Sequence, residues 1–186
     1  MKFEFEKSFF LVLLFLLDVK RLKKFIIIFF CLLTHEIAHV LMAKLFGLQT
    51  KKIICGLFGF RAKIIDFNLL NNKKKFLVLI AGPSVNFCFW LLCNDLVLKE
   101  INFFIGSINL LPIYPLDGGR ILILILKKLF FNRANKLFMR LNKIIIFLIC
   151  VAGIIFQNLC LLFLGFYLFL INKISSDDLI FELYFN

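Results

Sequence analysis

The chain alternates long apolar segments with short polar stretches. The apolar segments cover residues 8–19, 22–46, 76–98, 101–126, 141–157 and 159–173. A helix needs about 20 apolar residues to cross the hydrocarbon core of a bilayer, so this pattern predicts about six transmembrane segments, the first of them short for a span. Only the polar pair Gln157-Asn158 separates the last two segments, which predicts a tight helical hairpin.

The fourth apolar segment contains residues that do not fit one regular helix. Pro112, Pro115 and the pair Gly118-Gly119 fall within it. A proline inside a helix removes a hydrogen bond and clashes with the preceding turn. Because irregular backbone at membrane depth is tolerated where it lines a cavity or a site, we predict a broken helix here.

The polar stretch between the second and third apolar segments has the pattern of β-structure. Residues 51–68 are rich in β-branched and aromatic side chains, with Gly56 and Gly59 near the middle. This composition predicts a β-hairpin or two short strands. Residues 2–6 alternate between charged and apolar side chains, and we expect them to pair with that hairpin.

The composition places the chain among membrane proteins. Hydrophobic residues make up 62% of its 186 positions, whereas a soluble domain has about 45–50%. We therefore expect one membrane-embedded domain over residues 1–186. Its expected fold class is all-α integral membrane, with one broken helix and a small β-hairpin at the cytoplasmic side.

The formal net charge of +12 does not indicate nucleic-acid binding, because Lys and Arg lie between the apolar segments rather than on one basic face. The positive-inside rule places the basic stretches 44–75 and 127–143, read as loops, at the cytoplasmic face beside anionic lipid. The basic residues in 20–24 disagree if segment 8–19 spans fully, so that segment is re-entrant or those side chains snorkel. The 6 cysteines form no CxxC pair, and we expect them to be reduced.

The protein's 2 histidines, His35 and His39, lie in the second apolar segment with Glu36 beside the first. Residues four apart share one face of a helix, so both imidazoles can bind one metal ion while Glu36 reaches a water bound to it. This HExxH pattern is typical of zinc hydrolases. A charged group in a lipid-embedded helix costs about 2.5–3.5 kcal/mol on insertion scales, which favours function over the alternative of polar contacts between helices.

Catalytic zinc takes three protein ligands and keeps one open position. With no third histidine, the third ligand is Asp, Glu or Cys. Asp95 and Glu100 lie in the predicted outer loop, and Asp66 lies near the hairpin. Asp117 lies in the broken segment, where its carboxylate can approach a metal. The alternative for Asp117 is a cap at a helix start.

Three motifs occur in a fixed order: HEIAH at 35–39, AGPSVN at 81–86 and NLLPIYPLDGGR at 109–120. With them the chain resembles the site-2 protease family of intramembrane zinc metalloproteases, most closely its SpoIVFB-like sporulation branch. The resemblance covers nearly the whole chain and implies a six-helix membrane core. Many members carry CBS or PDZ domains, and we expect neither in this sequence.

The resemblance implies one Zn²⁺ per chain, bound by His35, His39 and Asp117, with Glu36 as the catalytic acid and base. Zinc would lower the pKa of a bound water, whose proton Glu36 would pass to the leaving amine. We expect Asn86, Gly82 and Gly118 to be structural positions near the site, Asn86 by bonding the broken helix.

A helical substrate must unwind before cleavage, because a helix engages its own carbonyl groups. The hairpin at 51–68 offers edge hydrogen bonds to an unwound strand. Asn109, Pro112 and Pro115 form the candidate substrate-binding segment, in which the prolines shape the loop; the alternative for Asn109 is a packing or helix-end role.

The expected partners are the lipid bilayer, a membrane-tethered protein substrate and a membrane regulatory protein, with no nucleic acid. By analogy with the sporulation branch, the substrate is a membrane-tethered transcription factor such as a sigma-factor precursor, cleaved at a bacterial cytoplasmic membrane that the chain crosses several times. Two other functions are a metal transporter, for which the apolar segments offer few polar residues, and a catalytically inactive relative, against which all four expected residues are present. Serine-protease GxSG and presenilin GxGD patterns are absent.

Overall fold

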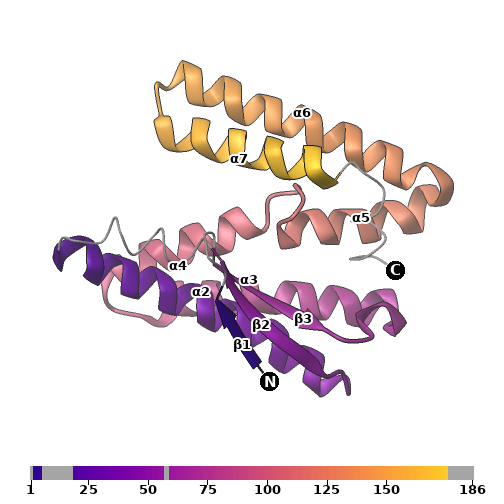
Figure 1. Ribbon diagram of the computed structural model, residues 1–186, viewed down its shortest axis with the longest axis horizontal. Coiled ribbons are helices and arrows are strands. Elements are labelled where there is room, and N and C mark those ends of the chain that lie inside the picture. The colour runs from indigo at the N-terminus through magenta and orange to yellow at the C-terminus, as the bar shows by residue number, and fades with distance from the viewer. Residues whose placement is uncertain (1, 6–18, 57–58, 176–186) are drawn as a thin grey trace. The chain divides into compact units, whose positions relative to one another are not determined.

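The computed structural model describes residues 2–5, 19–56 and 59–175, and the chain divides into two compact units, Met1–Asn109 and Leu110–Asn186. The first unit contains β1 (Lys2–Phe5), α2 (Val19–Leu45), β2 (Thr50–Gly56), β3 (Gly59–Ile64), a 3-10 turn at Phe67–Leu69, α3 (Asn72–Leu92) and α4 (Leu96–Asn109) (Figure 1). The second contains α5 (Asp117–Phe130), a 3-10 turn at Phe131–Arg133, α6 (Ala134–Ile155) and α7 (Leu159–Ser175). Residues 8–18 of the first predicted segment lie outside the described residues.

In the first unit, α3 packs against both α2 and α4. Small residues are buried on the packed helices, with Ala38 and Ala43 on α2 and Ala81 and Gly82 on α3. Where helices meet in lipid, small side chains let the backbones approach closely. A Cβ placed on Gly106 of α4 would lie 3.3 Å from the Cβ of Asn86 on α3.

The three described strands form one sheet in the order β1-β2-β3. Strand β2 pairs antiparallel with β3, with Ile53 opposite Ala62, and β1 pairs parallel with β2, with Phe3 also opposite Ile53. Ile53 is fully buried, and the Glu4 carboxylate binds the ammonium of Lys52 at 2.5 Å. The predicted hairpin and its pairing with the N-terminal stretch are both confirmed.

In the second unit, α6 and α7 form the expected helical hairpin and lie side by side (Figure 1). A Cβ on Gly153 of α6 would lie 2.9 Å from atoms of Leu162 on α7, so the absence of a side chain allows the close approach. Phe138 on α6 is fully buried beside Ile123 of α5. The predicted break is confirmed, because residues 110–116 between α4 and α5 are irregular, with a cis peptide bond between Tyr114 and Pro115.

Two predicted boundaries are wrong. The basic stretch 127–143 is mostly helical, because α5 continues to Phe130 and α6 starts at Ala134. Lys and Arg are good helix formers, and Phe138 and Asn142 four residues on are both fully buried, which gives this stretch an inward face. The predicted continuous segment 76–98 is also interrupted, since α3 ends at Leu92 and α4 starts at Leu96.

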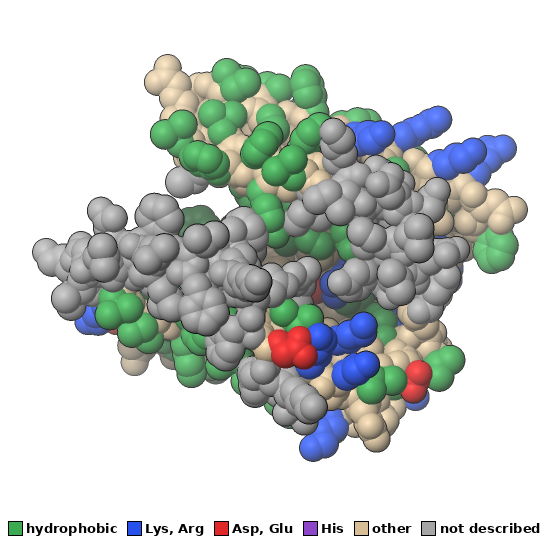
Figure 2. All heavy atoms as spheres, in the orientation of Figure 1, with side chains coloured by type: hydrophobic (Ala, Val, Ile, Leu, Met, Phe, Trp, Pro, Cys, Tyr) green, Lys and Arg blue, Asp and Glu red, His purple; other side chains and the backbone are tan. Residues whose placement is uncertain are grey.

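Within the described residues, three helical stretches are long and apolar enough to cross a membrane: Leu22–Leu45, Asn72–Leu92 and Asp117–Ile155, the last joining α5 and α6. A shorter apolar helix covers Leu161–Leu170. Hydrophobic side chains lie at the surface along α6 and α7, while Lys and Arg gather where α5 meets α6 (Figure 2). The protein is therefore mostly helical and of membrane character, and the count of six spans stays a prediction.

Candidate metal centre

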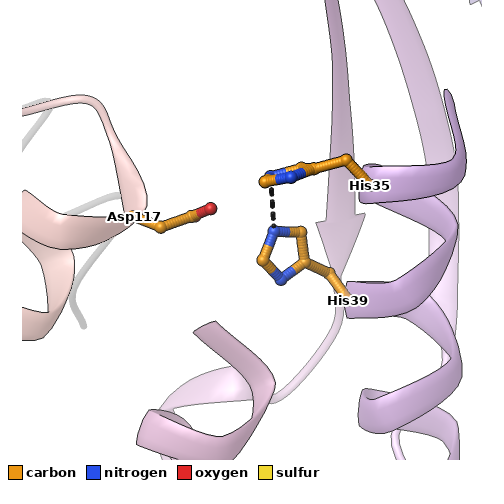
Figure 3. A group of neighbouring side chains, drawn as sticks. All are labelled: His35, His39 and Asp117. Atoms are coloured by element: carbon orange, nitrogen blue, oxygen red, sulfur yellow. Dashed lines mark hydrogen bonds between the residues drawn. The ribbon is translucent and has the colours of Figure 1, made fainter. Parts of the chain in front are cut away.

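His35 and His39 lie one turn apart on the same face of α2, and both side chains are buried. Their ring centroids are 4.8 Å apart, and their Nε2 atoms face each other at 3.1 Å (Figure 3). The spacing of the motif thus produces the shared face that it predicts.

The opposite nitrogen of each ring has a hydrogen-bond acceptor on α3. The Nδ1–H of His39 donates to the backbone carbonyl of Val78 at 2.7 Å, and Nδ1 of His35 lies 2.5 Å from Oδ1 of Asn86. A carbonyl oxygen only accepts, so the proton of a neutral His39 ring is on Nδ1. Partners of this kind fix the orientation and tautomer of a metal-binding histidine.

A series of hydrogen bonds between side-chain amides fixes the His35 tautomer as well. Nδ2 of Asn102 on α4 donates to the carbonyl of Leu98 at 2.9 Å, which fixes the positions of Nδ2 and Oδ1 in this amide. Asn86 therefore donates through Nδ2 to Oδ1 of Asn102 at 2.8 Å and turns its own Oδ1 toward His35. Nδ1 of His35 is then a donor, like that of His39. Both Asn side chains are buried.

With both protons on Nδ1, the two Nε2 lone pairs point toward each other across 3.1 Å. A tetrahedral ion with metal–nitrogen distances of about 2.0–2.1 Å holds two nitrogen ligands roughly 3.3 Å apart. The histidine pair therefore fits a zinc-like ion.

Gly82 of α3 lies directly against the two imidazoles. A Cβ at this position would come within 2.3 Å of Nε2 of His39 and 2.6 Å of Nε2 of His35. Only glycine leaves this space open, because any side chain would occupy the volume next to both nitrogens. The sequence reading of Gly82 as a structural position near the site has this geometric basis within the first unit.

Glu36 follows His35 on α2 and is half-buried. Its Oε1 accepts a hydrogen bond from the backbone N–H of Ala62 on β3. In an antiparallel pair, alternate residues point their N–H groups away from the partner strand. Ala62 is such a residue, so the carboxylate of the motif is bonded to the outer edge of the hairpin.

In the second unit, Asp117 is the first residue of α5 and is buried (Figure 3). Gly118 follows it, and a Cβ there would lie 2.1 Å from the carbonyl oxygen of Leu110. The first turn of α5 therefore packs directly against the backbone of the irregular segment. Carboxylates are favoured in the first turn of a helix, where the helix dipole is positive.

The candidate substrate-binding residues lie at and after the end of α4. Asn109 is the last residue of α4, and its amide donates to the carbonyl of Ile105 at 3.0 Å, as the helix-end alternative expects. Pro112 and Pro115 are partly buried in the irregular segment. Their contact with substrate stays a prediction.

Sequence reasoning did not identify four contacts around these residues: the acceptor at Val78, the donor at Ala62, and the buried amides of Asn142 and Asn172. A backbone group leaves no trace in the residue pattern. The two asparagines could have been identified, since a polar side chain in an apolar helix is costly unless it has a partner. Asn86 bonds Asn102 on α4, and its bond to His35 was not predicted.

The chain is similar to several known proteins. Residues 96–152 match the family model described as Peptidase family M50. Stage IV sporulation protein FB of Bacillus subtilis is 31% identical over 129 residues, which cover 62% of this chain and 45% of that protein. Zinc metalloprotease MJ0392 of Methanocaldococcus jannaschii is 24% identical over 161 residues, 78% of this chain and 47% of that protein.

A solved structure has the same fold. The site-2 protease from Methanocaldococcus jannaschii superimposes with a TM-score of 0.71 at 24% identity, covering 94% of this chain and 90% of that one. The chain spans about half the length of the curated relatives it matches. The resemblance that the sequence motifs suggested is confirmed.

Proposed function

We propose that the chain is a member of the site-2 protease family, to which it is similar, and that it is an intramembrane zinc metalloendopeptidase. It cleaves membrane-spanning or membrane-tethered proteins near the cytoplasmic face. The observation that carries this proposal is the histidine pair on α2, whose Nε2 atoms face each other while α3 holds both Nδ1 atoms.

We assign one zinc ion per chain to His35, His39 and Asp117. Two imidazoles and a carboxylate are a donor set that zinc favours, and three protein ligands are typical of catalytic sites. All three side chains are buried. When bound, zinc lowers the pKa of a coordinated water and polarises the carbonyl group that is attacked.

Glu36 is the acid and base in this proposal. Its carboxylate takes a proton from the attacking water and delivers it to the nitrogen of the leaving amine. The bond from Ala62 N–H engages Oε1 and fixes the position of the carboxylate beside β3. A backbone N–H supplies this bond, so no charged side chain is needed to position the Glu36 carboxylate.

The substrate binds as an extended strand. Besides the Ala62 N–H, which is bonded to Glu36, the outer edge of β3 carries backbone groups that can pair with such a strand. The irregular segment 110–116 offers a second set of backbone groups beside Asn109. By analogy with the sporulation branch that the sequence motifs resemble, the proposed role is release of a membrane-tethered transcription factor, such as a sigma-factor precursor.

The membrane setting rests on three apolar helical stretches and on large hydrophobic side chains at the surface, such as Phe147 on α6, which is 65% exposed. We propose a multi-pass protein of the bacterial cytoplasmic membrane with about six spans in one domain, whose hairpin and basic stretches face the cytoplasm.

The test pairs the full-length chain with the Glu36→Gln variant. Each is co-expressed with single-span proteins of the source organism, and the product termini are mapped by mass spectrometry. We expect site-specific products only with the unaltered chain, and equal zinc content in both purified proteins. Identical products from the variant would contradict the assignment of Glu36, and absence of zinc from both would contradict the metal site.

A further inference from the structure

We propose that Asn142 of α6 and Asn172 of α7 are positioning residues for the metal centre. They hold the backbone of Tyr114, three residues before Asp117, and so fix the start of α5. This inference rests on the proposed function, because it assigns the two asparagines to the site through its third ligand.

The two carboxamides form a closed ring of hydrogen bonds with one residue of the irregular segment. Tyr114 N–H donates to Oδ1 of Asn142 at 3.2 Å, and Nδ2 of Asn142 donates to Oδ1 of Asn172 at 3.1 Å. Nδ2 of Asn172 then donates to the carbonyl oxygen of Tyr114 at 3.0 Å. Both backbone groups of Tyr114 are thereby bonded to side chains, as a neighbouring strand would bond them.

The direction of every bond in this ring is fixed. The Tyr114 N–H can only donate and its carbonyl can only accept, so each amide has one orientation that satisfies the ring. A second bond from Nδ2 of Asn172 to the carbonyl of Leu168 at 2.9 Å anchors α7 to the same arrangement. Asn142 is fully buried and Asn172 is 7% exposed, so water does not compete for these groups.

Asparagines that merely join two helices would need only each other. Here the Asn142–Asn172 bond is one side of the ring, and the other two sides go to the backbone of the segment that leads into α5. A polar group in a lipid-embedded helix is costly unless it has a partner, and this pair finds its partners in the backbone of the irregular segment.

A shift of Tyr114 is passed on to Asp117 through backbone contacts. The N–H of Leu116 donates to the carbonyl of Ile113 at 2.9 Å, which closes a turn around Tyr114 and Pro115. A Cβ on Gly119 would lie 2.4 Å from the carbonyl carbon of Ile113. The first turn of α5 therefore lies directly against this turn at Gly119, so a shift of the turn would displace the start of α5.

The experiment measures zinc binding by the purified full-length chain in detergent or lipid, by competition with a chelator of known affinity. Thermal unfolding is followed with and without zinc. Asn142→Leu and Asn172→Leu remove the ring with little change in volume, and Asn142→Ala and Asn172→Ala serve if either leucine variant does not fold. The matched control is Asn158→Ala, which loses a bond to Leu161 N–H in the same helical hairpin.

We expect the ring variants to bind zinc about 10–100-fold more weakly, the range typical when an outer partner of a metal ligand is removed. The increase in unfolding temperature on adding zinc should shrink accordingly, while Asn158→Ala keeps both values. Lower stability without zinc but unchanged zinc affinity in the ring variants would overturn the inference and leave the asparagines as helix contacts.

The unaltered chain and Asp117→Ala separate the two levels of the proposal. If Asp117→Ala loses zinc affinity and the ring variants do not, only the positioning role is wrong. If the unaltered chain binds no zinc, or Asp117→Ala binds it equally well, the third ligand is wrong and the positioning role falls with it.

Discussion

The carboxylate of Glu36 is bonded to the backbone N–H of Ala62, which joins the HExxH motif on α2 to the outer edge of β3. The two residues are 26 apart in the chain. The hairpin therefore contacts the acid and base of the proposed reaction directly, and a change in the hairpin backbone acts on that carboxylate.

Replacing Ala62 by proline removes this donor. Proline lacks an N–H and is tolerated on an edge strand where that group points away from the sheet, so the β2–β3 pairing should persist. A hydrogen bond to a charged group contributes about 1.5–3 kcal/mol, and we expect kcat to fall at least about tenfold with little change in zinc content. Ala62→Gly keeps the N–H and is the control. Equal kcat in the proline variant and the control would show that the bond does not serve catalysis.

Replacing Gly82 by alanine fills the space beside both imidazoles. The added methyl carbon would lie 2.3 Å from Nε2 of His39, so the rings must turn away from each other. We expect zinc content, measured by atomic absorption, to fall to near zero. Gly153→Ala introduces a milder clash in the α6–α7 hairpin, 2.9 Å from Leu162, and should keep zinc. Zinc retained in Gly82→Ala would place the ion elsewhere.

Replacing Asn102 by leucine breaks the series of amide hydrogen bonds that fixes the tautomer of His35. Asn86 then loses its acceptor and can turn its NH₂ group toward Nδ1, which stabilises the wrong tautomer. We expect zinc affinity to drop about 10–100-fold. Cys31→Ala removes a different contact of the Asn102 amide, at 3.3 Å, and leaves the hydrogen bonds from Asn102 through Asn86 to His35 intact. Similar zinc affinities in these two variants would contradict the role of the amide hydrogen bonds in fixing the His35 tautomer.

Replacing Phe147 by lysine tests the lipid-facing surface of α6. A lysine near the centre of a spanning helix costs about 2.5–3.5 kcal/mol on insertion scales, so less protein should reach the membrane fraction. Phe131, 84% exposed in the 3-10 turn beside Lys128 and Arg133, should accept lysine without loss. Equal membrane fractions for the two variants would argue against α6 as a span.

Much of this arrangement could be predicted from local patterns. The i and i+4 spacing of His35 and His39 brings the rings onto one face of α2 as expected, and the prolines and glycines of the fourth segment break its helix. These features depend on neighbours in the chain, so a short window of sequence contains the information.

The remaining features depend on partners far apart in the chain. Asn142 and Asn172 bond Tyr114 from positions 28 and 58 residues away, and nothing in a residue pattern identifies a backbone group as a partner. The clustered Lys and Arg of 127–143 predict a loop, and the structure has mostly helix there. Burial of Phe138 and Asn142, four residues apart, stabilises that helix.

The acceptors behind the two imidazoles are an amide oxygen and a main-chain carbonyl, and neither carries a charge. A divalent ion bound by two neutral imidazoles and the Asp117 carboxylate, with the Glu36 carboxylate as base, sums to zero. Carboxylates in place of Asn86 and the Val78 carbonyl would leave two uncompensated negative charges in a medium of low dielectric constant, where isolated ions are strongly disfavoured. Uncharged acceptors thus allow the proposed centre to be electroneutral inside the bilayer.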